Sequence, residues 1–133
     1  MRIILGWYIA TLIIVSSIIP AQAATPEQVQ NVVKNLPESK SVENFYKREL
    51  FIKPFGLEVV LTFRSDDNKG LAPIIHSSNG YYLIYDIDLD GIVDGTLCYC
   101  SMGGDGPTKF FAKFGGAQKL YDTIIEESLK DPQ

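Results

Sequence analysis

Apolar residues recur with the period of an amphipathic helix in three segments of the chain. Residues 25–36 begin with Thr-Pro-Glu-Gln, a helix-starting pattern, and continue with apolar residues spaced i, i+3, i+4 and i+7 before Pro37. Residues 41–50 show a weaker version of this spacing, and residues 117–129 show a clear one. The pattern therefore predicts two N-terminal helices and one C-terminal helix.

Between these helices the pattern changes to the short β-branched and aromatic runs that are typical of strands. Polar or glycine-rich turns separate the runs, and such short connections favour antiparallel pairing. The expected strands cover residues 57–63, 71–76, 81–85, 96–102 and, less regularly, 108–114. We expect an α+β domain in which helices cover one face of an antiparallel meander of four or five strands.

The first 23 residues do not fit this domain, because Arg2 is their only charge and a long apolar run follows it. The run ends in Ala21-Gln22-Ala23, the small-residue pattern of a cleavage site. We expect residues 1–23 to be a secretory signal peptide and residues 24–133 to form one exported domain, periplasmic or extracellular. The alternative is an uncleaved membrane anchor, since the uncharged run is also about long enough to span a bilayer.

The most distinctive stretch is an acidic loop between two expected strands, at residues 86–94. Acids occupy its positions 1, 3, 5 and 9, and Gly91 occupies position 6. Alternate side chains of such a loop converge on one cation, and the glycine permits the sharp turn that this requires. The expected calcium ligands are the side chains of Asp86, Asp88, Asp90 and Asp94 and the backbone carbonyl of Ile92.

The loop resembles the D-x-D-x-D-G-x-x-D calcium loops of EF-hands, thrombospondin type 3 repeats and FG-GAP repeats, over residues 86–94 alone. It departs from the EF-hand pattern at position 12, where Leu97 replaces a bidentate glutamate. Strand-forming residues flank it, whereas helices flank an EF-hand loop. The resemblance therefore implies modest calcium affinity and no helix opening of the sensor type.

Two other interpretations of the loop stay open. Without a cation it is an acidic hairpin turn, although four neighbouring carboxylates then repel one another. In the second, the same acids hold a catalytic cation in a small hydrolase, which needs an open coordination position and a nearby base. Asp105, in the next turn, is a further candidate for the metal shell. The acids of the 65–70 turn, which include Asp67, are expected to face solvent.

The two cysteines, Cys98 and Cys100, share one face of an expected strand because they are two residues apart. They are buried thiols, a disulfide whose Cα atoms lie near the upper limit of distance for bridging, or, with Met102, a soft-sulfur site for copper. Copper handling is the least favoured of these. His76 is the only histidine, and we expect it at the surface, at the end of a strand.

Charge and missing motifs narrow the function classes further. The chain has 133 residues and a formal net charge of −4, which suits one small domain without a basic cluster. Nucleic-acid binding is therefore not expected. The sequence contains no phosphate loop, zinc signature or serine elbow. The expected function is that of an exported, non-catalytic calcium-binding protein, with a protein partner left unassigned.

Overall fold

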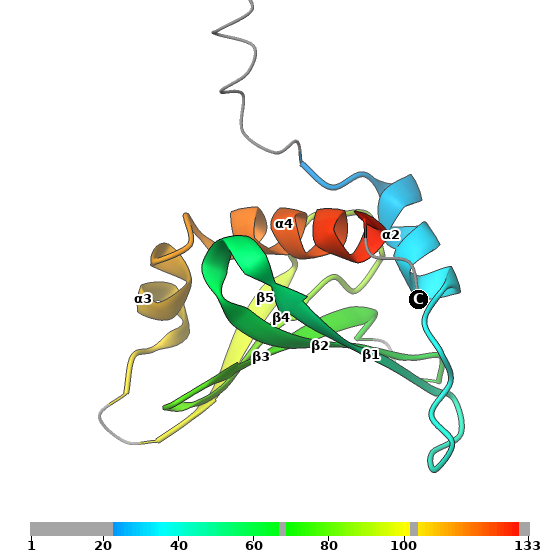
Figure 1. Ribbon diagram of the computed structural model, residues 1–133, viewed down its shortest axis with the longest axis horizontal. Helices are drawn as coiled ribbons and strands as arrows, with labels where there is room; N and C mark the ends of the chain where they lie inside the picture. Colours follow the sequence, from blue (N-terminus) through cyan, green and yellow to red (C-terminus); the bar gives the residue numbers. More distant parts are fainter. Residues whose placement is uncertain (1–22, 67–68, 102–103, 131–133) are drawn as a thin grey trace, which may run out of the picture.

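A five-stranded antiparallel sheet carries helices on one face in the computed structural model, which describes residues 23–66, 69–101 and 104–130 (Figure 1). Each strand pairs with the next one along the chain. The strands are β1 (Phe45–Ile52), β2 (Leu57–Arg64), β3 (Leu71–Ser77), β4 (Gly80–Tyr85) and β5 (Gly95–Cys100). The helices are α2 (Pro26–Lys34), α3 (Pro107–Ala112) and α4 (Ala117–Lys130), and a single 3-10 turn, η1 (Lys53–Phe55), joins β1 to β2. The expected α+β class and the meander are confirmed.

Helix α2 begins as its sequence predicts, with a reciprocal cap. The amide of Gln28 donates to the Thr25 hydroxyl at 3.2 Å, and the amide of Thr25 donates to the Gln28 side chain at 3.0 Å. This capping box satisfies two amide groups that would otherwise lack partners. The helix buries Val29 and Val32. The first of the two expected N-terminal helices is therefore present.

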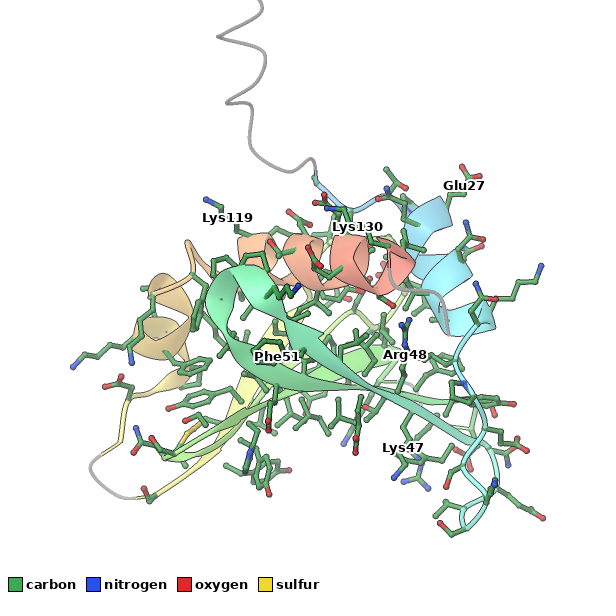
Figure 2. The ribbon with its side chains drawn as sticks, viewed as in Figure 1. Glu27, Lys47, Arg48, Phe51, Lys119 and Lys130 are labelled. Atoms are coloured by element: carbon green, nitrogen blue, oxygen red, sulfur yellow. A yellow bond between two sulfur atoms is a disulfide. The ribbon has the colours of Figure 1, made fainter. Side chains whose placement is uncertain are left out.

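The core lies between the helices and the inner face of the sheet. Leu50, Val59, Ile75 and Tyr82 face one another across four neighbouring strands, and all four are buried. Helix α4 covers this row with Leu120, Tyr121, Ile124 and Ile125, which are almost fully buried. Arg48 links β1 to α4 by donating to the Ser128 carbonyl at 3.0 Å (Figure 2). The long apolar stripe of α4 thus fixes that helix over the sheet.

The second expected N-terminal helix is wrong, because residues 45–52 form the edge strand β1. All eight residues pair with β2, from Phe45 opposite Arg64 to Ile52 opposite Leu57. Leu50 and Ile52 are buried, whereas Phe51 between them is exposed. This alternation has the period of a strand, and the aromatic and branched residues of the segment suit one. Pairing with β2 therefore overrides a weak helical spacing.

The strand expected at residues 108–114 is also wrong, because α3 occupies most of that segment. Pro107 stands at the start of the helix, where its missing amide costs nothing. Phe110, Phe111 and Phe114 do not alternate as in a half-buried strand, and the helix buries Phe110 and Phe111 together. The ring of Phe110 stacks on Tyr82 of β4, with centroids 3.7 Å apart. The meander reaches five strands through β1 instead.

Candidate metal centre

The acidic loop connects β4 to β5 and is closed at its base by backbone hydrogen bonds. The amide of Asp94 donates to the carbonyl of Tyr85 at 2.8 Å. Asp86 also pairs with Leu71 at the start of β3, through two backbone hydrogen bonds of 3.0 and 3.2 Å. Asp86 and Asp94 therefore lie next to the ends of β4 and β5, and only the residues between them extend away from the sheet.

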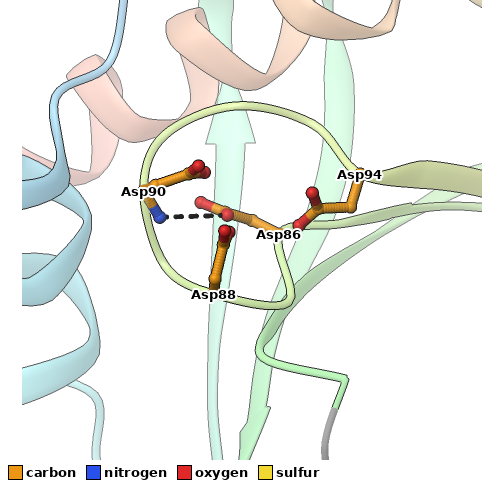
Figure 3. A group of neighbouring side chains, drawn as sticks. All are labelled: Asp86, Asp88, Asp90 and Asp94. Atoms are coloured by element: carbon orange, nitrogen blue, oxygen red, sulfur yellow. Dashed lines mark hydrogen bonds between the residues drawn. The ribbon is translucent and has the colours of Figure 1, made fainter.

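Four carboxylates converge inside this loop, as the spacing predicts (Figure 3). Each offers one oxygen, and these oxygens all lie within 4.8 Å of one another. Two oxygens on opposite sides of a calcium ion are about 4.6–5.2 Å apart, since each lies 2.3–2.6 Å from the ion. The cluster consists of Asp86, Asp88, Asp90 and Asp94. It is a group of acids that could hold a metal ion.

Asp86 is the buried member of the cluster and the best supported. Its Oδ1 accepts from the amide of Asp90 at 3.2 Å, which Figure 3 shows as a dashed line. Its Oδ2 accepts from the amide of Gly91 at 3.0 Å and from the hydroxyl of Tyr121 at 2.6 Å. Burial raises the pKa of Asp86 above its usual range, and these hydrogen bonds partly offset that rise. The hydrogen bonds thus favour the ionised form that binds a cation, whereas burial disfavours it and keeps the pKa raised in the absence of an ion.

A count of lone pairs shows that the cluster retains oxygens for an ion. A carboxylate has about four acceptor positions, and the three hydrogen bonds to Asp86 leave one on Oδ1. Oδ1 of Asp90 accepts from the amide of Ile92 at 2.9 Å, and Oδ2 of Asp94 accepts from the amide of Ile87 at 2.6 Å. Each of these two acids keeps its second oxygen. The donor set therefore fits a hard cation.

Exposed Asp88 and half-buried Asp90 show the effect of crowding like charges on their pKa values. Loss of hydration within the loop, followed by the hydrogen bond with the Asp90 carboxyl, raises the pKa of Asp88. The pKa of Asp90 is lowered, chiefly because its carboxylate accepts the backbone hydrogen bond from Ile92. The pKa values of Asp88 and Asp90 are thus shifted in opposite directions, as expected when adjacent carboxyls compete for one proton.

Gly91 has the two properties that its position demands. Its φ of +89° lies in the region that favours glycine, as the turn interpretation predicts. A Cβ atom at this position would also collide with the carbonyl of Ala24, which lies against the loop. The loop therefore needs glycine both for its own turn and for the approach of the segment before α2.

Helix α4 supports the loop with a second layer of polar side chains. Gln118 donates from Nε2 to the carbonyl of Gly91 at 2.8 Å, and its Oε1 accepts from the amide of Val93 at 2.8 Å. The two residues flank Ile92, so Gln118 holds the backbone on both sides of it. Tyr121 reaches the same loop through Asp86. Burial raises the pKa of Tyr121 far above its usual range, which keeps its hydroxyl protonated and able to donate.

The sequence pattern does not identify these supporting residues. Tyr121 falls within the apolar stripe predicted over residues 117–129, and no motif sets Gln118 or Asp122 apart. The three belong to consecutive turns of one helix face, i, i+3 and i+4. The polar residues beside the apolar stripe indicate that this side of the helix makes polar contacts. Their partners in the acidic loop become known only from the position of α4 in the fold.

The other predicted ligands have mixed outcomes. The ligand role of the Ile92 carbonyl stays a prediction. Position 12 supplies no side-chain oxygen, because it is Leu97, which lies in β5 and pairs with Leu83 of β4. Asp105 is not part of the cluster. Its carboxylate lies 2.9 Å from Lys113 and 3.5 Å from Lys109 instead.

Two further candidates lie away from the loop. Cys98 and Cys100 form a disulfide within β5, with Cα atoms 5.4 Å apart, inside the usual range for a bridge. This disulfide leaves neither cysteine as a thiolate ligand for copper, and Met102 lies outside the described residues. Asp67, expected to face solvent, also lies outside them. His76 is exposed at the end of β3, as expected, and stacks on Tyr81 with ring centroids 4.9 Å apart.

A surface pocket of about 630 Å³ lies on the sheet. It is lined by residues of β1 to β4, including Phe51, Glu58, His76 and Tyr81, and by none of the four clustered acids. A hydrolase of the kind considered above would bind its substrate next to the cation. This pocket therefore does not serve such a site.

Fold and site together define an α+β meander domain with an acidic loop that could bind a metal ion. Comparisons with protein-family models, with curated proteins and with solved structures found no match. Within residues 23–66, 69–101 and 104–130, none of the helices has the length and apolar character to cross a membrane.

Proposed function

We propose that this chain is an exported, non-catalytic protein in which calcium binds the acidic loop and stabilises the connection between β4 and β5. The observation that carries the proposal is the convergence of four carboxylate oxygens within 4.8 Å of one another. Without a cation, this arrangement concentrates negative charge beside a buried carboxylate, Asp86. A divalent ion relieves that repulsion and ties the two ends of the loop together.

The donor set favours calcium over other common cations. All four side chains offer hard carboxylate oxygens, which suit calcium and magnesium rather than the softer transition metals. Magnesium usually takes only one or two protein carboxylates and keeps several waters. Calcium accepts six to eight oxygens in flexible geometry, so it accommodates four acids and a backbone carbonyl. The proposed ligands are those predicted from the spacing, including the carbonyl of Ile92.

A structural role is better supported than a catalytic one. Asp86, Asp90 and Asp94 each accept at least one backbone hydrogen bond within the loop, so they already hold its conformation. The pocket on the sheet is lined by none of them. A hydrolase would instead need a substrate site and a base beside the ion. These observations favour a cation that holds the loop together.

The proposed location is the periplasm or the cell exterior. It is supported by the apolar run of residues 1–23 and by the small residues Ala21 and Ala23 at its end. Calcium concentrations outside the cell suit a weak site, because extracellular modules bind it with dissociation constants of about 10⁻⁴–10⁻³ M.

Thermal melting with and without calcium tests the proposal. We expect a dissociation constant on the order of 10⁻⁴ M, because position 12 offers no bidentate glutamate. At a hundredfold excess, binding to the native state adds about 2.7 kcal/mol and raises Tm by roughly 10 °C. Asp88→Asn should remove most of this shift, because it exchanges a charged ligand for a neutral one.

Asp66→Asn is the matched control, since Asp66 lies in another turn beside Arg64, at 3.8 Å. It should leave the calcium shift unchanged. Coincident melting curves of the parent chain in calcium and in chelator would refute the proposal. A shift that magnesium reproduces in full would refute the choice of ion.

A further inference from the structure

Ala24 stands at the boundary between the expected signal peptide and the domain, and it contacts both the acidic loop and α4. Its backbone nitrogen donates a hydrogen bond to Oδ1 of Asp122 at 2.9 Å. Its carbonyl lies against Gly91, where no side chain would fit. Ala24 is half-buried and packs against the core, whereas Ala23 is exposed. The first residue of the expected mature chain is therefore held in place.

Asp122 connects this residue to the loop through Gln118. The same Oδ1 atom accepts a second hydrogen bond, from Gln118 Nε2, at 2.9 Å. Gln118 in turn binds the carbonyl of Gly91 and the amide of Val93. Both donor positions and the acceptor of its amide are thus used, which fixes the orientation of the side chain. A continuous chain of hydrogen bonds runs from the nitrogen of Ala24 to the backbone beside Ile92.

We propose that cleavage between Ala23 and Ala24 creates an N-terminal ammonium that pairs with Asp122 and, through Gln118, stabilises the acidic loop. Hydrolysis adds one water across the amide bond. The water oxygen leaves Ala23 with a carboxylate, and the nitrogen of Ala24 takes up protons to become an ammonium at neutral pH. This inference rests on the export proposed above.

Cleavage changes the strength of a contact that already exists. In the intact chain the nitrogen of Ala24 donates a neutral hydrogen bond, and its length of 2.9 Å falls within the range of charge-assisted ones. A charged donor makes such a bond roughly twice as strong. The ammonium would also lie beside Thr25, at the positive end of the α2 dipole, where a cation is unfavourable without a partner. Asp122 supplies the opposite charge.

The test uses the full chain exported from a secretory host, with its first residue established by intact mass. Inserting one glycine between Ala23 and Ala24 retains the Ala24 amide but moves the ammonium away from Asp122. Asp122→Asn retains an acceptor but removes the charge. We expect either change to lower Tm in metal-free buffer by about 5 °C and to weaken calcium binding about fivefold. The glycine insertion and Asp122→Asn combined should lower Tm little more than either change alone, because both break the same ion pair.

Glu126→Gln is the matched control, one turn further along α4, where Glu126 pairs with Lys130 at 3.0 Å. It should leave calcium affinity unchanged. A second measurement is the rate at which an amine-reactive acylating reagent modifies the N-terminal amine. We expect the amine of the parent chain to react about tenfold more slowly than that of the glycine-inserted chain, because pairing favours its protonated form.

Three results would overturn the inference. The first is an exported chain that retains residues 1–23. The second is an equal effect of Asp122→Asn with and without the inserted glycine, and the third is an equal acylation rate in the two chains. The acylation rates need no substitution at Asp122, so they decide the question even if that variant does not fold. Because melting in metal-free buffer does not involve calcium, a failure of the calcium proposal leaves this test standing.

Discussion

The hydroxyl of Tyr121 donates a 2.6 Å hydrogen bond to Oδ2 of Asp86, which joins the C-terminal helix to the first acid of the loop. Both residues are buried, and 35 positions separate them in the chain. A hydrogen bond to a buried charge is worth more than one between neutral groups, because an ionised carboxylate without partners is costly to bury. The loop and α4 are therefore expected to depend on each other.

Tyr121→Phe removes this hydrogen bond and retains the packing of the ring. We expect it to lower stability by about 1.5–3 kcal/mol in metal-free buffer, because Asp86 stays buried with one partner fewer. The loss should be smaller in calcium, since the ion supplies the same carboxylate with a counter-charge that the hydroxyl does not provide. Urea unfolding in both buffers measures the difference. Tyr99→Phe, at an exposed position of β5, is the control and should change stability by less than about 0.5 kcal/mol. An equal loss in the two buffers would contradict the link to the ion site.

Gln118→Ala should weaken calcium binding without removing a ligand. The variant deprives Gly91 and Val93 of their side-chain partner, so the backbone beside Ile92 loses its support. Residues that orient metal ligands typically affect affinity by about 10–100-fold, and we expect about tenfold here. Calorimetric titration measures it. Lys119→Ala is the matched control, because the neighbouring Lys119 is exposed and its side chain points away from the sheet (Figure 2). Unchanged affinity in the Gln118 variant would show that the loop is rigid on its own.

Gly91→Ala should be strongly destabilising, and Gly95→Ala should not. The added methyl group at position 91 meets a positive φ and the carbonyl of Ala24, whereas at position 95 it meets no atom within 4 Å. We expect a loss of at least about 2 kcal/mol for the first variant and a change within about 0.5 kcal/mol for the second. Denaturant unfolding of both variants in metal-free buffer provides the comparison. Similar values for the two would mean that the segment around Ala24 moves aside without cost.

The effect of calcium on stability should depend on pH. The pKa values of Asp86 and Asp88 lie above the ordinary 3.8 in the folded state, so the metal-free fold binds protons more tightly than the unfolded chain. The stability that these two groups contribute is present below pH 3.8 and is lost as the pH rises through their folded-state pKa values. Asp90 acts in the opposite sense, because its pKa is lowered.

Calcium competes with these protons, so its stabilising effect should be largest near neutral pH and should shrink as the pH falls towards 4. Melting curves with calcium and after its removal by a chelating resin, at pH 7.5 and pH 4.5, measure the effect. Asp88→Asn should reduce the pH dependence, since it removes one of the two groups with raised pKa. A calcium shift of equal size at both pH values would argue against binding by these carboxylates.

Local patterns were sufficient for the features that depend on neighbouring residues. The capping box of α2, the apolar stripe of α4 and the turn at Gly91 follow from spacings of three to six residues, and all three are present. The convergence of the four acids also follows from spacing, because alternate side chains of a tight loop point inward. In each case the residues that make the interaction are close in the chain.

Tertiary contacts decided the rest, because the relevant partners are distant in sequence. Residues 45–52 form a strand since β2 offers them a paired edge, and residues 107–112 form a helix whose phenylalanines pack on Tyr82. The same holds for the support of the loop. Gln118, Tyr121 and Asp122 act on residues 25–98 positions away, and only the placement of α4 over the sheet brings them there. Sequence alone thus determined where oxygens gather, whereas the fold decided what holds them in position, because burial and hydrogen bonding depend on which surfaces meet.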